Sequence, residues 1–151
     1  MENKKEVLNN LYQKYIKGTQ PKIFVTYKVA VLCRLTNQVN KEILNRCGLS
    51  KVYVNTKVLK HLYDKKPAEE FDFIIGNLHK IVKYPDRIYR NKNEKRGRWC
   101  FIKKIKNELY ISSLEYEEET LWIATVFRVR KEKYLESFEL LWSWENDESP
   151  S

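Results

Sequence analysis

Glycine, proline and histidine are scarce in this chain of 151 residues, which contains four glycines, four prolines and two histidines. So few glycines and prolines argue against a glycine-rich nucleotide-binding fold and against a linker-rich protein. The three cysteines, Cys33, Cys47 and Cys100, are widely spaced without a CxxC pair, so we expect reduced thiols and no disulfide framework. The histidines, His61 and His79, form no cluster at zinc spacing. We therefore expect no metal and no cofactor.

Long apolar runs are also missing. No stretch approaches the roughly 20 apolar residues that a spanning helix needs, and the charged N-terminus lacks the apolar run of a secretory signal. We therefore expect a cytoplasmic protein with no membrane partner. Hydrophobic residues nevertheless make up 42% of the chain and aromatic residues 13%. This composition excludes an intrinsically disordered chain, because it provides enough apolar surface for a core.

Charge is distributed unevenly along the chain. The net charge is +9, but residues 1–50 carry +6, residues 51–106 carry +10 and residues 107–151 carry −7. The densest basic stretch runs from Arg87 to Lys106 and includes aromatic side chains. Because phosphates bind cations and unpaired bases stack on flat rings, we interpret this stretch as an RNA-binding surface. Its predicted contacts are Arg90, Lys92, Lys95, Arg96, Arg98, Trp99 and Lys104. The alternative is a solvated basic loop with core aromatic residues behind it.

The hydrophobic pattern changes near residue 85 from helical spacing to the alternation of strands. We expect helices over residues 2–17 and 37–47, from Asn55 or Thr56 onward, and from Pro67 until Pro85 ends helical structure. The earlier part also contains short strand candidates at Val29–Leu35 and Lys51–Val54. Alternation predicts strands at Arg87–Arg90, Trp99–Ile105, Glu108–Leu114 and Thr120–Arg130, with a tight turn at Lys106–Asn107 and a loop over Glu115–Glu119. A short helix near Lys131–Phe138 and an extended segment, Glu139–Trp144, follow.

This order of elements predicts the α+β class, with N-terminal helices followed by a roughly four-stranded antiparallel sheet. We expect residues 1–50 to form a helical extension or cap and residues 51–144 to form the domain proper. Residues 145–151 contain Glu145, Asp147 and Glu148 and are predicted to be an acidic flexible tail.

Metal-independent RNA cleavage requires a base, an acid and groups that hold the phosphate. His61 lies at the edge of a predicted apolar helix stripe, and histidine exchanges protons readily near neutral pH; the alternative is a boundary histidine with a hydrogen-bond partner. Thr125 is the lone hydroxyl in the row that strict alternation makes from Leu121, Ile123, Thr125, Phe127 and Val129. The alternative for Thr125 is an ordinary β-branched sheet residue. Arg87 and Arg90 bracket Tyr89 and are candidate phosphate-holding cations; the alternative is that both are ordinary surface charges.

From Val52 to about Trp144 the chain resembles the phage-associated nuclease families of the barnase–EndoU–colicin–RelE superfamily. The resemblance is carried by the segments Val54–His61, Ile81–Tyr89, Trp99–Lys104 and Leu121–Phe127. It implies two helices packed on a four-stranded antiparallel sheet. It also implies metal-independent ribonuclease chemistry, often found in toxins or mobile elements.

Carried over residue by residue, the resemblance implies a site with His61, Thr125 and basic residues among Arg87, Lys103 and Lys104. In the mechanism that we expect, His61 is the general base or acid, Lys103 and Arg87 hold the scissile phosphate, and Thr125 donates to it. Because a second well-placed histidine is missing, a lysine, tyrosine or threonine would have to replace it. RNA is the expected partner. The alternatives are a non-catalytic RNA-binding module, or a protein inhibitor or adaptor that binds a host nucleoprotein; an inhibitor protein is a further candidate partner.

Overall fold

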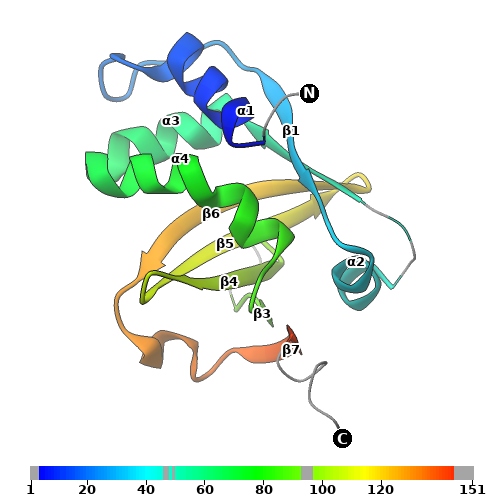
Figure 1. The fold of residues 1–151 in the computed structure, drawn as a ribbon. Coiled ribbons are helices and arrows are strands. Elements are labelled where there is room, and N and C mark those ends of the chain that lie inside the picture. The colour runs from blue at the N-terminus through cyan, green and yellow to red at the C-terminus, as the bar shows by residue number, and fades with distance from the viewer. Residues whose placement is uncertain (1–3, 46–47, 49, 93–96, 145–151) are drawn as a thin grey trace, which may run out of the picture.

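One mixed β-sheet organises the molecule, and most of its helices gather on one face of that sheet (Figure 1). The computed structural model describes residues 4–45, 48, 50–92 and 97–144. The helices in these ranges are α1 (Lys4–Leu11), α2 (Asn37–Leu44), α3 (Thr56–Lys65) and α4 (Ala68–Lys83), with a π-helical turn η1 (Tyr12–Ile16) and a 3₁₀ turn η3 (Glu132–Leu135). The strands are β1 (Val29–Arg34), β2 (Lys51–Asn55), β3 (Arg87–Arg90), β4 (Trp99–Ile105), β5 (Glu108–Glu117), β6 (Thr120–Val129) and β7 (Glu139–Ser143). The predicted α+β class is confirmed.

The sheet has the order β1-β2-β6-β5-β4-β3-β7. Its neighbouring strands are antiparallel except for β2 and β6, which pair in parallel through Val52↔Leu121 and Tyr53↔Trp122. This pair is short, so the second half of β6 has no partner strand on the β2 side among the described residues. The N-terminal half of the chain therefore joins the C-terminal meander at one point of the sheet.

The expected sheet of roughly four strands is too small. The predicted antiparallel meander is present as β3–β6, but β1 and β2 extend it at one end and β7 extends it at the other. Alternation of apolar residues identifies a strand without identifying its partner, so the sequence did not show that these segments join the same sheet. β1 pairs with β2 across the boundary proposed near residue 50, and that boundary stays a prediction. Residues 145–151, the predicted tail, lie outside the described residues.

Local sequence signals place several element ends where they were expected. The Asn55 side chain accepts a hydrogen bond from the Val58 N–H at 2.9 Å and caps α3. Lys106 and Asn107 both have positive φ angles, 50° and 67°, as a two-residue hairpin turn requires. The loop expected over Glu115–Glu119 is shorter than predicted, because β5 continues to Glu117. Within the described residues, no helix is both long and apolar enough to cross a membrane.

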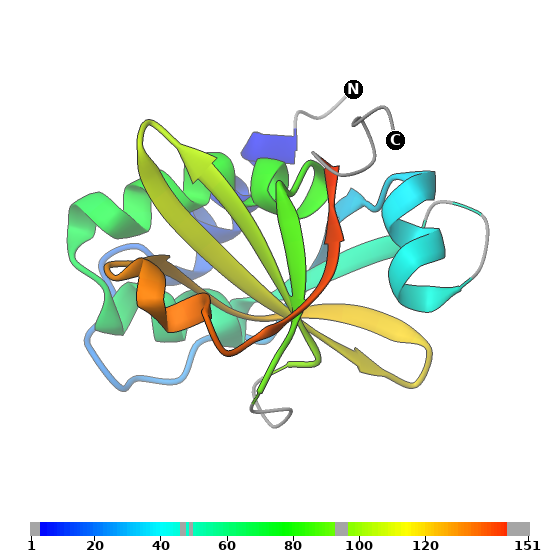
Figure 2. The same cartoon turned by 90° about the horizontal axis from the view of Figure 1, so that it is seen from below.

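Hydrophobic side chains are buried on both faces of the sheet. On the helix face, which packs against α1, α3 and α4, the core includes Leu59, Ile74 and Phe101. On the opposite face a second cluster contains Cys100 and Ile111 and is covered by residues from the segment around η3. Figure 2 shows this C-terminal segment, in orange to red, on the side of the sheet away from α3 and α4.

A β-bulge in β6 changes which side chains share a face. Ser113 pairs with Thr125 and Leu114 pairs with Ile123, so Ala124 is an extra residue in β6. Leu121, Ile123 and Val126 consequently pack in the core of the helix face, whereas Phe127 and Val129 belong to the opposite cluster. The single row predicted from Leu121 to Val129 is therefore wrong. The bulge turns Thr125 to the face opposite the helix-face core.

Gly97 sits where the chain enters β4 against β5. Its φ is +112°, and a Cβ there would lie 3.0 Å from Ser113 Cβ and 3.1 Å from the Leu114 carbonyl oxygen. We expect Gly97→Ala to lower the unfolding free energy by about 1–3 kcal/mol, because it adds backbone strain and a steric overlap. Urea denaturation measures this loss.

Gly18→Ala is the matched control for Gly97→Ala. Gly18 also has a positive φ, +77°, but a Cβ there meets nothing within 4 Å. The unfolding free energy of Gly18→Ala should therefore fall only by the cost of backbone strain, about 1–2 kcal/mol. If Gly97→Ala is no more destabilising than Gly18→Ala, the close approach to β5 does not matter.

A buried lysine connects α3 to the segment before β1. The ammonium of Lys60, a residue only 6% exposed, donates to Thr19 Oγ1 at 2.8 Å, to the Gln20 carbonyl at 2.7 Å and to Asp64 Oδ1 at 2.8 Å. Asp64 in turn accepts from the Lys22 N–H at 3.1 Å. The hydrogen bond from Lys60 holds the pKa of the Asp64 carboxyl below its usual range, although partial desolvation opposes this shift.

The stability of the protein should decrease as the pH falls through the depressed pKa of Asp64. Because this pKa is lower in the folded chain, the contribution of Asp64 is complete above its unfolded value of about 3.9 and is lost once the pH falls below the folded value. Asp64→Asn removes the contribution at every pH. Its Tm should therefore decrease less than that of the unmodified protein between about pH 6 and about pH 2. Asp72→Asn, on the exposed side of α4, should behave like the unmodified protein.

Candidate active site

A pocket of about 520 Å³ opens between α3, the start of α4 and the unpaired half of β6. It is lined from the helical side by residues 61–70 and from the sheet by residues of β4, β5 and β6. The pocket exists because β2 separates from β6 after Trp122 and its chain continues directly into α3. α3 thus takes the place beside β6 that a neighbouring strand would otherwise occupy.

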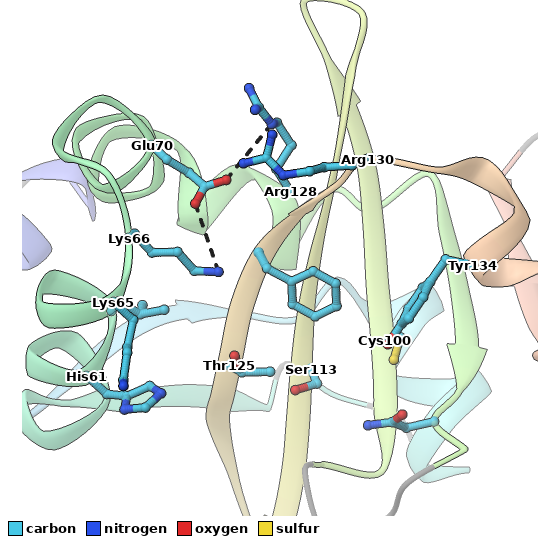
Figure 3. Close-up of a pocket in the computed structure, with 13 residues that line it drawn as sticks. His61, Lys65, Lys66, Glu70, Cys100, Ser113, Thr125, Arg128, Arg130 and Tyr134 are labelled. Carbon is cyan, nitrogen blue, oxygen red and sulfur yellow. Dashed lines mark ion pairs between the residues drawn. The ribbon is translucent and has the colours of Figure 1, made fainter.

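Four polar side chains form a row on the helical side of the pocket. Figure 3 shows His61, Lys65, Lys66 and Glu70 along this side, with His61 at one end of the row and Glu70 at the other. His61 is exposed on α3, and Glu70 lies in the first turn of α4 with a side chain only 9% exposed. An imidazole and a carboxylate are the two commonest acid–base groups of enzymes. The pocket therefore holds a candidate pair of proton donor and acceptor.

Two hydroxyl groups face this row from the sheet. Thr125 and Ser113 are directly paired on β6 and β5, and both line the pocket (Figure 3). Ser113 is 1% exposed, so it forms part of the pocket floor, whereas Thr125 is half-buried nearer the opening. The position of Thr125 depends on the bulge at Ala124. Hydroxyls in such a place can donate hydrogen bonds to a bound anion.

Positive charge surrounds the pocket. Lys66 Nζ lies 3.9 Å from Glu70 Oε2, and Arg128 Nε lies 3.9 Å from Glu70 Oε1. The Lys66 ammonium is also 5.8 Å from the centre of the Phe127 ring, so it reaches around the edge of β6. Lys65 and Arg130 add two exposed cations. Glu70 thus offsets only part of the charge, and the remaining cations suit a phosphate group.

The one thiol in the pocket is not an activated nucleophile. Cys100 is 4% exposed, and burial raises the pKa of its thiol to about 12. The group is therefore protonated at neutral pH and does not act as a thiolate. In the part of the chain that the structure describes, no group of three or more histidine, cysteine, aspartate or glutamate side chains is placed to hold a metal ion.

The structure brings two of the four predicted catalytic residues together. His61 and Thr125, far apart in the sequence, line the same pocket. Lys103 lies elsewhere: its ammonium donates to the Tyr84 carbonyl at 2.7 Å and is 3.6 Å from Asp86 Oδ1. Arg87 also lies outside the pocket and instead lines, with Lys104, a separate hollow of about 470 Å³. The expected phosphate-holding role of Lys103 and Arg87 therefore has no geometric support next to His61.

The predicted RNA-binding residues are scattered, and one of them, Trp99, is buried. Trp99 is only 5% exposed because it points into the core of the helix face, so its ring is not available for a base. Arg90 forms a 2.9 Å ion pair with Glu139, Lys92 bonds to the Ser137 hydroxyl, and the Arg98 guanidinium lies 5.5 Å from the Trp99 ring. Lys104 is exposed. Lys95 and Arg96 lie outside the described residues.

Sequence reasoning missed most of the charged groups in the pocket. No sequence pattern pointed to Glu70, Lys65 or Lys66 as site residues. Arg128 lies on the same face of β6 as Val126, whereas Thr125 lies on the opposite face with Phe127 and Val129. Both Arg128 and Thr125 line the pocket because, within the described residues, no strand pairs with this half of β6 on the β2 side. One signal was available: Lys65 and Lys66 stand one helical turn after His61, and Arg128 and Arg130 follow Thr125 within five residues. Two basic pairs near the two site residues predicted a common cation cluster better than overall charge density did.

Comparison with known proteins identifies a matching family. A family described as phage-Barnase-EndoU-ColicinE5/D-RelE like nuclease 3 matches residues 31–136. This range includes most of β1, all of β2–β6, α2–α4 and η3, and every residue of the pocket. Neither the curated proteins nor the solved structures give a match.

Proposed function

This chain belongs to the phage-Barnase-EndoU-ColicinE5/D-RelE like nuclease family, and we propose that it is a metal-independent endoribonuclease whose active site is the pocket between α3 and β6. One observation carries the proposal. His61 and Glu70 stand at opposite ends of a row of cations, and the hydroxyl of Thr125 faces that row (Figure 3). These are the groups that internal cleavage of RNA requires: a base, an acid and donors to the phosphate.

The proposed reaction is attack of a ribose 2′-oxygen on the adjacent phosphorus. Glu70, held beside Lys66 and Arg128, accepts the 2′-hydroxyl proton while the new oxygen–phosphorus bond forms. The bond from phosphorus to the 5′-oxygen breaks, and protonated His61 gives its proton to that oxygen. Displacement at phosphorus proceeds with the attacking and leaving oxygens roughly in line, so an acid and a base at opposite ends of the pocket suit it.

The cations and the hydroxyl serve the phosphate itself. Negative charge grows on the non-bridging phosphate oxygens as the new bond forms, and fixed donors in a partly dry site stabilise it strongly. Lys65 and Lys66 lie between His61 and Glu70, Arg128 lies beside Glu70, and Thr125 donates from the sheet. Because the attacking group is the 2′-hydroxyl, the substrate is RNA and not DNA.

The decisive experiment is cleavage of a labelled RNA oligonucleotide in EDTA. We expect EDTA-resistant products ending in a 2′,3′-cyclic phosphate, and no cleavage of the same oligonucleotide with 2′-deoxy sugars. Cleavage that EDTA abolishes would overturn metal independence. Binding without cleavage would favour the alternative of a non-catalytic RNA-binding module.

A toxin role follows from the same chemistry and has its own test. Induced expression of an active ribonuclease should arrest bacterial growth, and expression of His61→Ala should not. The control is His79→Gln, because His79 is the second histidine of the chain and lies on α4 outside the pocket. This variant should arrest growth like the unmodified chain. Equal growth with all three proteins would argue against a toxin.

A further inference from the structure

The segment between η1 and β1, together with the first residues of β1, exposes apolar side chains that no other part of the described chain covers. Five such residues occur within residues 23–31, and their exposed fractions are 54% for Ile23, 99% for Phe24, 58% for Tyr27, 42% for Val29 and 36% for Val31. Single exposed apolar residues are common on protein surfaces, but a run of this length marks an interaction site. We call these five residues the apolar strip.

The apolar strip is held in a fixed position by α3. The Lys60 ammonium binds Thr19 and Gln20, and Asp64 binds the Lys22 N–H. Nearer β1, Thr56 Oγ1 donates to the Thr26 carbonyl at 2.7 Å and accepts from the Lys28 N–H at 2.9 Å. Figure 1 shows this segment running past α3 into β1. Side chains presented on an anchored segment lose little conformational entropy when a partner binds.

The strip continues into a free sheet edge. β1 is the terminal strand of the sheet, and only β2 pairs with it within the described residues. An unpaired edge presents backbone N–H and C=O groups to any extended chain that approaches. Val29 and Val31 alternate along that edge, as expected for contacts to alternate side chains of an added strand.

Charge indicates the kind of partner. Residues 17–35 contain Lys17, Lys22, Lys28 and Arg34 and no aspartate or glutamate. These four residues are all exposed. A segment whose exposed side chains are apolar or cationic complements an acidic partner with apolar residues. A second copy paired through β1 would instead bring cations against cations.

We infer that residues 17–35 dock an acidic protein, which adds an extended strand to β1 and covers Phe24. RNA fits the surface less well, because three of the five strip residues, Ile23, Val29 and Val31, are aliphatic and only Phe24 and Tyr27 offer a ring for a base. The surface lies on the side of α3 that carries Lys60 and Asp64, whereas the nuclease pocket is lined by His61 and Lys65. The docking site is therefore distinct from the pocket.

Peptide binding tests this inference without any dependence on RNA cleavage. The probe is a short peptide in which valine alternates with glutamate, and the comparison peptide has lysine in place of glutamate. We expect the acidic peptide to bind, the basic peptide to fail, and the amides of β1 to gain protection from hydrogen exchange. No binding, equal binding of both peptides, or protection confined to residues 61–66 would overturn the inference.

Variants locate the binding surface. Phe24→Ala should lower the affinity for the acidic peptide by about tenfold or more, as expected for a central aromatic contact. Lys28→Glu combined with Arg34→Glu should abolish binding. Tyr84→Ala, at an aromatic residue 57% exposed outside the strip, should leave the affinity unchanged.

Two other occupants give different results, and each would overturn the inference. If the Phe24 and Lys28/Arg34 variants bind a 2′-O-methyl RNA more weakly and bind the acidic peptide with unchanged affinity, the surface binds RNA. If the unmodified protein forms a dimer in analytical ultracentrifugation that Phe24→Ala abolishes, the occupant is a second copy. Since the peptide readout needs no nuclease activity, failure of one proposal leaves the other standing.

Discussion

Replacement of His61 by alanine is expected to reduce the rate of RNA cleavage by about 10²–10⁴-fold, the range associated with loss of a general acid or base. The loss should appear in kcat, because His61 acts on the leaving oxygen and contributes little to binding of the chain. The imidazole is exposed on α3, so its removal leaves no cavity and should leave thermal stability nearly unchanged. Single-turnover cleavage of a labelled RNA in EDTA measures the effect.

Two results would contradict this role of His61. If His61→Ala and His79→Gln reduce the rate of RNA cleavage equally, the cause is a general effect on the fold. A His61→Ala protein that cleaves at the normal rate but binds RNA more weakly would show that the histidine contacts RNA without transferring a proton. Circular dichroism of all three proteins excludes unfolding as the cause.

Replacement of Glu70 by glutamine is expected to lower kcat by about 10²–10³-fold, because it removes the proton acceptor and keeps the shape of the side chain. Binding should change in the opposite direction. Glu70 partly neutralises Lys66 and Arg128, from which it is separated by 3.9 Å in each case. Without that carboxylate the pocket is more positive, so the affinity for RNA should hold or increase, most clearly at low salt.

Glu69→Gln is the matched control for this experiment. Glu69 is the preceding residue of α4 and carries the same charge, but it is exposed and lies outside the pocket. It should leave kcat unchanged. If Glu69→Gln and Glu70→Gln have the same effect, net charge and not the position of Glu70 determines activity.

The double variant tests whether His61 and Glu70 act in one reaction step. Groups that act as a unit show strongly non-additive losses, so His61→Ala with Glu70→Gln should be little worse than the more damaging single change. If the fold-reduction of kcat in the double variant equals the product of the two single reductions, the two residues contribute independently. In that case another pocket group, such as Lys65, would be the proton acceptor.

The sequence predicted most elements of the fold because their signals are local. The Asn55 cap, the Lys106–Asn107 turn and the end of α4 before Pro85 depend on neighbouring residues alone, and all are confirmed. Pairing of β2 with β6 depends instead on residues far apart in the sequence, and no local pattern reveals it. The size of the sheet was underestimated for that reason.

The site was predictable only in part, for a related reason. His61 and Thr125 were candidates because each is an unusual residue in its own element. Glu70 looked like an ordinary acidic residue at the start of a helix, and its contacts with Lys66 and Arg128 appear only in three dimensions. The bulge at Ala124 changes the face of every later residue in β6, and alternation cannot predict a single inserted position.

The short parallel pairing of β2 with β6 also controls when the pocket can exist. Val52 pairs with Leu121, so this part of the sheet cannot form until Leu121 has been synthesised. His61 and Glu70 therefore leave the ribosome long before Ser113, Thr125 and Arg128, which complete the pocket from the other side. The nascent chain thus contains His61 and Glu70 before the surface that they face. Under the proposed mechanism we expect an incomplete chain to lack nuclease activity until this long-range sheet contact forms.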